Sequence, residues 1–467
     1  MSEKSAGKLL QEKLINPKKH VCDRMSSEEI KKADAFCDGY KEFLYQCKTE
    51  REVVEYVERC AVKEGFRVFE ELGEPLAAGA KIYRVNRGKA VILATIGRRD
   101  IREGVHISVA HIDSPRIDLK QCPVYEEKEL ALFKTHYYGG IKKYQWTSIP
   151  LSLRGRIVKA DGSFIDIKLG EDRNDPKFVI TDLLPHLGRE QAEKKLGEAI
   201  QGEELNVLIG SRPFKDDEVS EKVKLNVLAL LFEKYGVTET DFLSAELELV
   251  PAFTVDDIGF DRSLIGGYGH DDRVCAYPAI QAIFDCDTPE YTSITVLADK
   301  EEVGSDGNTG MNSSYFKYFV EDLARMYGCE GRDVLRRSKC LSADVNAGFD
   351  PTFATVYEQN NASFLNHGVV VTKYTGSRGK SGTSDASAEY VAYVRKLMDD
   401  NDIVWQTGEL GKVDMGGGGT VAMYVANLDV DVIDVGVPVL SMHAPYEVVA
   451  KTDVYMAYKA FLAFFKN

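Results

Sequence analysis

The sequence lacks any apolar run of the roughly 18 residues that a membrane-spanning helix requires. Its opening residues, Met-Ser-Glu-Lys-Ser-Ala-Gly-Lys, contain no apolar core of the kind found in secretory signals, so we expect no leader peptide. No CxxC pair occurs, and the nine cysteines are an odd number. These absences favour a cytoplasmic protein with reduced thiols, without a cysteine zinc site or a membrane partner.

Positive charge is also scarce. The 467 residues carry 59 Lys and Arg against 74 Asp and Glu, which gives a formal net charge of -15. An acidic surface of this size argues against nucleic acid as the main partner. Solubility alone accounts for much of the excess, and the remaining carboxylates are available for a cation site. Apolar residues make up 44% of the chain, so a sizeable core can be buried.

Internal repeats and low-complexity linkers are absent, so the fold is inferred from hydrophobic periodicity. Residues 26–65 show helical spacing behind the N-cap candidates Ser26 and Ser27. Short apolar runs predict buried strands at 90–96, 105–112, 293–298, 340–345 and 432–437. Helical patterns occupy 276–284, 314–327, 385–397 and 455–465. This alternation of strands and helices favours an α/β layered fold.

A β-rich block interrupts the alternation. Residues 124–135 alternate in polarity, and hairpin-like runs at 151–169 surround Asp161-Gly162. We therefore predict one discontinuous α/β domain, at 1–120 and 246–467, with an inserted β-rich domain at 121–245.

Polar residues follow two of the predicted strands directly. The run at 105–112 leads directly into His111 and Asp113. A histidine at a strand end can bind a metal through one ring nitrogen, while a nearby carboxylate fixes the tautomer through the other. The alternative is a buried histidine with a satisfied hydrogen bond. Glu301 and Glu302 follow the run at 293–298, at the sheet edge where open α/β folds bind ligands. The alternative there is a solvated turn.

Three further segments supply ligand types. Asp271 and Asp272 precede a predicted helix, where carboxylates are ordinary caps, but aspartate also commonly bridges two cations. Asp344 lies at the end of the strand predicted at 340–345, and His443 lies just past another predicted strand. Each alone could be structural. Taken together, the segments offer the imidazole and carboxylate ligands that two zinc ions use.

In this order, the motifs resemble those of the aspartyl aminopeptidase family of metalloaminopeptidases, which also includes vacuolar aminopeptidase I. The resemblance spans nearly the whole chain and rests on His111-Ile112-Asp113-Ser114-Pro115-Arg116, Gly269-His270-Asp271-Asp272-Arg273, Glu301-Glu302-Val303-Gly304-Ser305, Ser342-Ala343-Asp344 and Met442-His443, with Tyr138-Gly139-Gly140, Leu153-Arg154-Gly155-Arg156 and Pro185-His186-Leu187 in the insertion. It implies a zinc-peptidase α/β/α catalytic domain with an inserted dimerisation domain.

The resemblance also implies a ligand set for two Zn²⁺ ions per subunit, which Co²⁺ or Mn²⁺ could replace. Asp271 would bridge the ions, with His111 and Asp344 completing one and Glu302 and His443 the other. Some members carry Asp-Asn where this chain has Asp271-Asp272, so the role of the second aspartate stays open. We interpret the neighbouring His270 as non-ligating.

The expected reaction is removal of the first residue from peptides with a free N-terminus. By the resemblance, Glu301 would be the general base for a zinc-activated water, and Asp113 would orient His111. His186 would reach into a neighbouring subunit's site within a homo-oligomer, a tetrahedral dodecamer of dimers.

Other interpretations stay open. A related dinuclear dipeptidase, carboxypeptidase or amidohydrolase would share the metal chemistry. A non-catalytic assembly protein on a peptidase fold is disfavoured because every expected ligand is present. Arg378 or Lys380 could attract an acidic first residue of the substrate, yet we expect a preference for neutral or hydrophobic residues. The glycine-rich run at 376–382 lacks the spacing of a phosphate-binding loop. The run at 416–419 is interpreted as part of the substrate pocket, with a flexible turn as the equal alternative.

Overall fold

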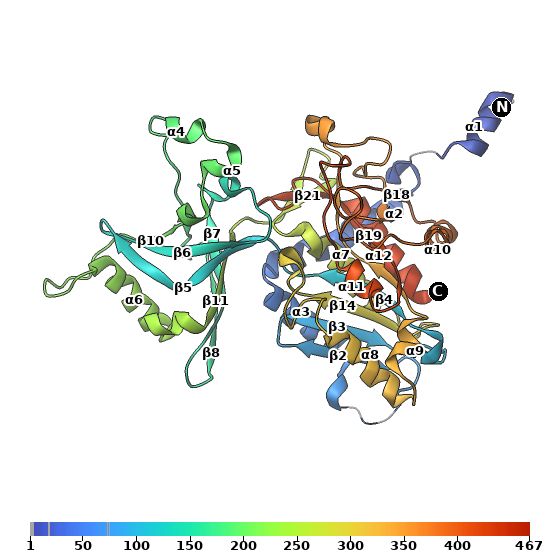
Figure 1. Cartoon of the computed structure of the whole chain (residues 1–467), viewed down its shortest axis with the longest axis horizontal. Helices are drawn as coiled ribbons and strands as arrows, with labels where there is room; N and C mark the ends of the chain where they lie inside the picture. The colour runs from blue at the N-terminus through green and yellow to red at the C-terminus, as the bar shows by residue number, and fades with distance from the viewer. Residues whose placement is uncertain (1–3, 17–18, 72, 74) are drawn as a thin grey trace.

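The computed structural model describes residues 4–16, 19–71, 73 and 75–467. Two bodies lie side by side, each built around its own sheet (Figure 1). The larger body holds a nine-stranded sheet in which β14, β4, β15 and β19 run parallel to one another. The strand order is β1 (Arg67–Val68), β2 (Lys81–Asn86), β3 (Ala90–Thr95), β14 (Ser293–Ala298), β4 (His106–His111), β15 (Lys339–Ser342), β19 (Asp431–Gly436), β17 (Val369–Thr372) and β18 (Trp405–Thr407).

Helices cover both faces of this sheet, because its strands are apolar on both sides. Along β3, Val91 and Leu93 enter one core, while Ile92 and Ala94 enter the other. Successive side chains of a strand point to opposite faces, so a continuous apolar run needs a layer on each. The first core packs against α2 (Ser27–Gln46), α3 (Glu50–Lys63), α7 (His270–Phe284), α10 (Ala388–Asp400) and α12 (Lys451–Lys466); the second packs against α8 (Tyr315–Met326), α9 (Gly331–Leu335) and α11 (Ala422–Ala426).

The helical region predicted at 26–65 is two helices. Ser26 caps α2 in a capping box with Glu29, as the N-cap pattern indicates. A second capping box, between Thr49 and Glu52, begins α3. Because Thr49 has extended backbone angles (φ -125°, ψ 159°), the chain turns there instead of continuing one helix.

The smaller body holds a seven-stranded antiparallel sheet (Figure 1). Its order is β8 (Phe164–Leu169), β7 (Leu151–Val158), β11 (Ala245–Pro251), β5 (Arg116–Glu127), β6 (Leu130–Tyr138), β10 (Val207–Gly210) and β9 (Val179–Ile180). The second boundary of the insertion differs from the sequence expectation. Strand β11 lies where the second piece of the α/β domain was expected to begin, but it pairs with β7 and β5 and so belongs to the second sheet.

Three helices accompany this second sheet: α4 (Arg189–Ala192), α5 (Leu196–Ala199) and α6 (Lys222–Tyr235). Helix α6 was not anticipated from the sequence. Its apolar residues surround the helix almost completely, so no single apolar stripe marks it. Leu230 and Phe232 remain exposed on it, at 57% and 61%.

Two small sheets complete the larger body: β12 (Asp256–Ile258), β13 (Leu264–Gly267) and β21 (Glu447–Ala450) form one, and β16 (Asn346–Ala347) and β20 (Pro438–Val439) the other. Glu447 pairs with Gly267, which brings the loop before β21 next to the start of α7. An N-terminal helix, α1 (Ala6–Leu14), projects from the body without a buried residue (Figure 1). None of the described helices meets the length and hydropathy of a membrane span.

Candidate functional site

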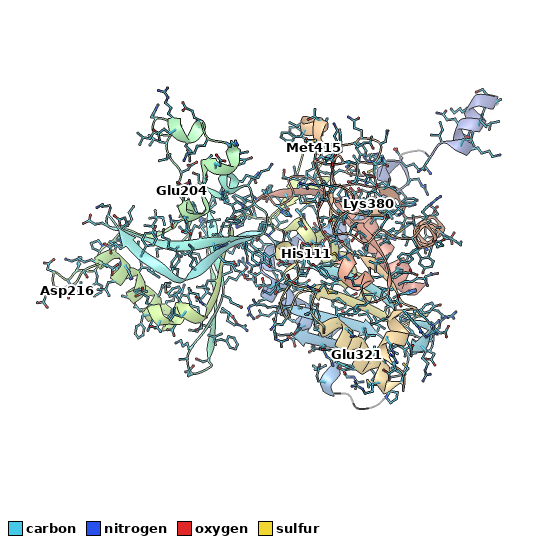
Figure 2. The ribbon with its side chains drawn as sticks, in the orientation of Figure 1. His111, Glu204, Asp216, Glu321, Lys380 and Met415 are labelled. Carbon is cyan, nitrogen blue, oxygen red and sulfur yellow. The ribbon has the colours of Figure 1, made fainter. Side chains whose placement is uncertain are left out.

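Parallel strands bring three of the candidate segments to one edge of the large sheet. Strand β4 ends at His111, which lies beside Ala298, the last residue of β14. Glu301 and Glu302 follow β14 in a short turn, and Asp344 stands two residues beyond β15. Because these strands run in the same direction, their carboxyl ends meet at the edge where open α/β sheets bind ligands. Figure 2 shows His111 on the side of the larger body that faces the second sheet.

The other two segments approach this edge from outside the central strands. Asp271 stands at the start of α7, joined to Asp272 by a cis peptide bond, and His443 stands in the loop between β20 and β21. One carboxylate oxygen of Asp271 lies 3.2 Å from Nε2 of His111, and the other lies 3.1 Å from Nε2 of His443. Asp271 therefore stands between the two histidines.

The ligand atoms fall into compact groups. Within 4.8 Å of one another lie His111, Asp271 and Asp344 in one group, and Asp271, Glu302 and His443 in a second. His111 also groups with Glu301 and Glu302. All are nitrogen and oxygen donors of the kinds that zinc accepts.

Each of the two histidines uses Nδ1 for a hydrogen bond to a backbone carbonyl, and its Nε2 faces carboxylate oxygens. Nδ1 of His443 donates to the carbonyl of Gly140 at 2.7 Å, and Nδ1 of His111 lies 3.1 Å from the carbonyl oxygen of Asp113. When the rings are neutral, each Nε2 presents a lone pair towards carboxylate oxygens, and a cation between them would be bound by both. In the described part of the chain, no Lys or Arg pairs with Asp271, Glu302 or Asp344. The donor set thus fits a metal.

The electrostatics point the same way. Burial raises the pKa of Glu301 to about 7, to which Asp113 and Asp271 contribute against the opposing effect of His111. Burial, together with neighbouring carboxylates, also holds the pKa values of Glu302 and Asp344 well above their usual range. These shifts reflect burial first and the crowding of negative charges second, and a bound cation would compensate those charges.

Comparison with known proteins identifies the family. Residues 43–465 match the family described as aminopeptidase I zinc metalloprotease (M18). The chain belongs to the M18 family of zinc aminopeptidases. It is 48% identical over 461 residues to a probable M18 family aminopeptidase 1 of Clostridium acetobutylicum, covering 97% of this chain and 99% of that relative.

Solved structures agree. The crystal structure of an M18 aminopeptidase from Thermotoga maritima superposes with a TM-score of 0.93 at 43% identity, covering 97% of this chain and 100% of that one. The mApe1 dodecamer of S. cerevisiae shares the fold, with a TM-score of 0.76 at 21% identity over 94% of this chain and 97% of that one. The family and the α/β fold predicted from the sequence are confirmed, and the protein is a zinc metalloaminopeptidase.

Asp113 organises the centre of this M18 aminopeptidase without joining the candidate ligand groups. Its carboxylate accepts the backbone N–H groups of Glu301 and Glu302, at 3.1 and 3.2 Å, and its Oδ1 lies 3.3 Å from Nδ1 of His111. The hydroxyl of Tyr138, from the second sheet, donates to its Oδ2 at 2.7 Å. Asp113 therefore links the Glu301–Glu302 turn to the strand that carries His111.

Sequence reasoning missed Glu447. Its two oxygens accept the N–H groups of His443 and Asp271, at 2.7 and 3.2 Å, which ties the loop of one residue to the helix start of the other. The only local signal was an acid four residues after His443. The contact of Glu447 with Asp271 could not be predicted, because the two residues are far apart in the sequence.

The two residues whose roles stayed open from the sequence have buried partners. Oδ2 of Asp272 accepts the backbone N–H of His111 at 3.3 Å. The hydroxyl of Tyr40 lies 2.6 Å from Nδ1 of His270, whose pKa burial and Arg273 lower to about 3. His270 belongs to none of the candidate ligand groups among the described residues.

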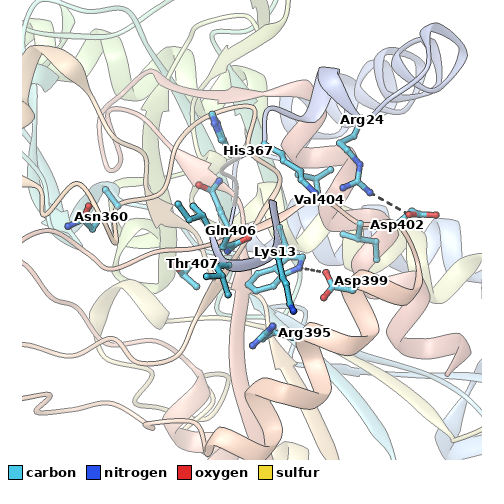
Figure 3. A pocket seen from close by; sticks show the side chains of 17 residues that line it. Lys13, Arg24, Asn360, His367, Arg395, Asp399, Asp402, Val404, Gln406 and Thr407 are labelled. Carbon is cyan, nitrogen blue, oxygen red and sulfur yellow. Dashed lines mark hydrogen bonds and ion pairs between the residues drawn. The ribbon is translucent and has the colours of Figure 1, made fainter. Parts of the chain in front are cut away.

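His186 lies apart from this cluster, on an exposed loop between β9 and α4 of the smaller body. A cavity of about 740 Å³ also lies away from the cluster, between residues 13–16, 19 and 24 on one side and β18 on the other (Figure 3). Its carboxylates are already engaged, Asp402 with Arg24 at 3.5 Å and Asp399 with the indole N–H of Trp405 at 3.0 Å.

Proposed function

We propose that this M18 aminopeptidase holds two zinc ions, one bound by His111 and Asp344 and the other by Glu302 and His443, with Asp271 bridging them. The observation that carries the proposal is the position of Asp271, whose two oxygens face two different Nε2 atoms at 3.2 and 3.1 Å. A carboxylate between two such nitrogens is suited to join two cations.

Two bound zinc ions would polarise the peptide carbonyl and bring the pKa of an attacking water towards about 7. Glu301 would accept that water's proton and pass it to the leaving amine. Its Oε2 lies 3.8 Å from Nε2 of His111, so the carboxylate borders the ligand cluster.

Glu301→Gln tests this assignment. We expect both zinc ions to remain, since an amide in place of the base leaves the five ligands intact, while kcat falls by about 10²- to 10⁴-fold. Zinc is measured by atomic absorption beside the peptidase rate. Glu28→Gln, at an exposed position of α2, is the matched control and should behave as wild type. A wild-type rate would refute the role of Glu301, and loss of zinc would make Glu301 a ligand instead.

We propose peptides with a free N-terminus as substrates, because the surrounding carboxylates supply negative charge for an α-ammonium group. A neutral or hydrophobic first residue is favoured, since Lys380 is already paired with Asp385 at 2.8 Å and lies over the ring of Tyr374. A panel of aminoacyl substrates, with acidic and neutral first residues, measures this preference on enzyme reconstituted with Zn²⁺, Co²⁺ or Mn²⁺.

We further propose that the β-rich insertion mediates a homo-oligomer in the cytoplasm, assembled as a dodecamer. The exposed apolar residues Leu230 and Phe232 of α6 support a partner surface on the insertion. A second support is the fold shared with the mApe1 dodecamer. Within such an assembly, His186 would act in a neighbouring subunit's site. Light scattering on the purified protein reports the mass of the assembly.

A further inference from the structure

The end of strand β6 lies next to both candidate ligand groups, the one with His111 and the one with His443. Its last residue, Tyr138, donates its hydroxyl to Oδ2 of Asp113 at 2.7 Å. Two residues later, the carbonyl of Gly140 accepts Nδ1–H of His443 at 2.7 Å. Between them, a Cβ placed on Gly139 would stand 3.3 Å from Cβ and from Oε2 of Glu302. The segment 138–140 thus contacts groups on either side of Asp271.

This segment is held rigidly at its base. The guanidinium of Arg116 lies 3.9 Å from the ring centre of Tyr138 and is itself buried. It pairs with Glu50 of α3 and with Glu248 of β11, both at 3.3 Å. The pair with Glu50 joins the second sheet to the helix layer of the larger body, and the pair with Glu248 lies within the second sheet. Burial, together with the adjacent Asp113, raises the pKa of Tyr138, so its hydroxyl keeps the proton that it donates.

We propose that Tyr138 and Gly140 are positioning residues, through which the inserted sheet orients the zinc ligands. Tyr138 acts through Asp113, which holds His111 and the Glu301–Glu302 turn. Gly140 fixes the ring of His443, so that Nε2 points at the cluster. Outer hydrogen-bond partners of this kind set the orientation and basicity of metal ligands. The inference rests on the ligand set proposed above.

The structural consequence is a link between the insertion and the metal. The ligands themselves all come from the larger body, whereas their outer partners at 138–140 come from the second sheet. A displacement of that sheet would therefore loosen ligands on both sides of the cluster at once.

Tyr138→Phe tests the first contact, because it removes the hydroxyl and leaves the ring over Arg116. The dissociation constant for zinc, measured by competition with a chelator at constant pH, should rise about 10- to 100-fold. Tyr137→Phe is the matched control. Tyr137 is the neighbouring residue, is 40% exposed and does not belong to the ligand groups. It should bind zinc as the wild type does. Equal zinc affinity of the two variants would overturn the proposal.

Gly139→Ala tests the position of the segment 138–140 against Glu302 and does not depend on the tyrosine variant. Gly139 and Gly162 both have positive φ, 72° and 85°, so alanine strains the backbone at either position. Only at Gly139 does the added Cβ meet Glu302, whereas Gly162 faces open space. Zinc affinity should therefore fall in Gly139→Ala and stay at the wild-type value in Gly162→Ala; equal losses would overturn the proposed contact. A wild-type protein that binds no zinc would instead refute the proposed function.

Discussion

Acidification should destabilise the protein through His106, the first residue of β4, at the opposite end of the strand from His111. Its ring is buried between the rings of Tyr291 and Phe464, with centroids 4.6 and 4.5 Å away. Nδ1–H donates to the carbonyl of Phe464 at 2.9 Å. Burial, aided by Lys339 and opposed by that hydrogen bond, lowers the pKa of His106 from 6.5 to about 4.

The direction of the effect follows from proton uptake. Below pH 6.5 the unfolded chain binds a proton at this histidine, whereas the folded protein does so only near pH 4. The free energy of unfolding is therefore intact above pH 6.5 and falls progressively as the pH drops towards 4. From the difference between the two pKa values, the free energy of unfolding falls by about 3 kcal/mol once the pH is below both values, and by about 2 kcal/mol at pH 5.

His106→Gln isolates this contribution, because the amide can donate the same hydrogen bond but does not titrate. We expect the wild type to lose about 2 kcal/mol more than the variant between pH 7.5 and pH 5. Urea unfolding of both proteins in the presence of a chelator measures the loss. His111 and His443 titrate in both proteins, so their contribution cancels in the comparison. Losses that agree within about 0.5 kcal/mol would refute the reasoning.

Two further predictions concern the metal cluster and the assembly. Asp271→Ala should lose zinc as well as activity, because the carboxylate belongs to both ligand groups that flank it; full zinc occupancy by metal analysis would contradict the bridging role. Subunits carrying His186→Ala, mixed with subunits carrying Glu301→Gln, should recover peptidase activity if His186 acts in a neighbouring site. Verified mixed oligomers that stay inactive would exclude that role.

Much of the architecture around the site could be predicted from local patterns. The apolar runs that became β4 and β14 are buried on both faces; β4 ends at His111, and β14 ends shortly before Glu301. The capping box at Ser26 begins α2 where the sequence indicates. Such features depend on periodicity and on neighbours within one turn, which are visible in one segment of chain.

Other features depend on partners far along the chain. Strand β11 looks like any apolar strand, and only its pairing with β7 and β5 assigns it to the second sheet. Helix α6 has no amphipathic stripe to mark it, since apolar residues surround it almost completely. Glu447 and Gly140 became visible as outer partners of the cluster only once the fold placed them beside Asp271 and His443.

By itself, the sequence determined which residue types could bind a metal and that they stand at strand ends or before a helix. It also determined the family, through the order of its motifs. Only the tertiary structure decided that Asp271 lies between two histidines more than a hundred residues away on either side. The reason is physical: strand ends and caps follow from local periodicity, whereas the meeting of donors depends on which strands pair in parallel and how the sheets pack.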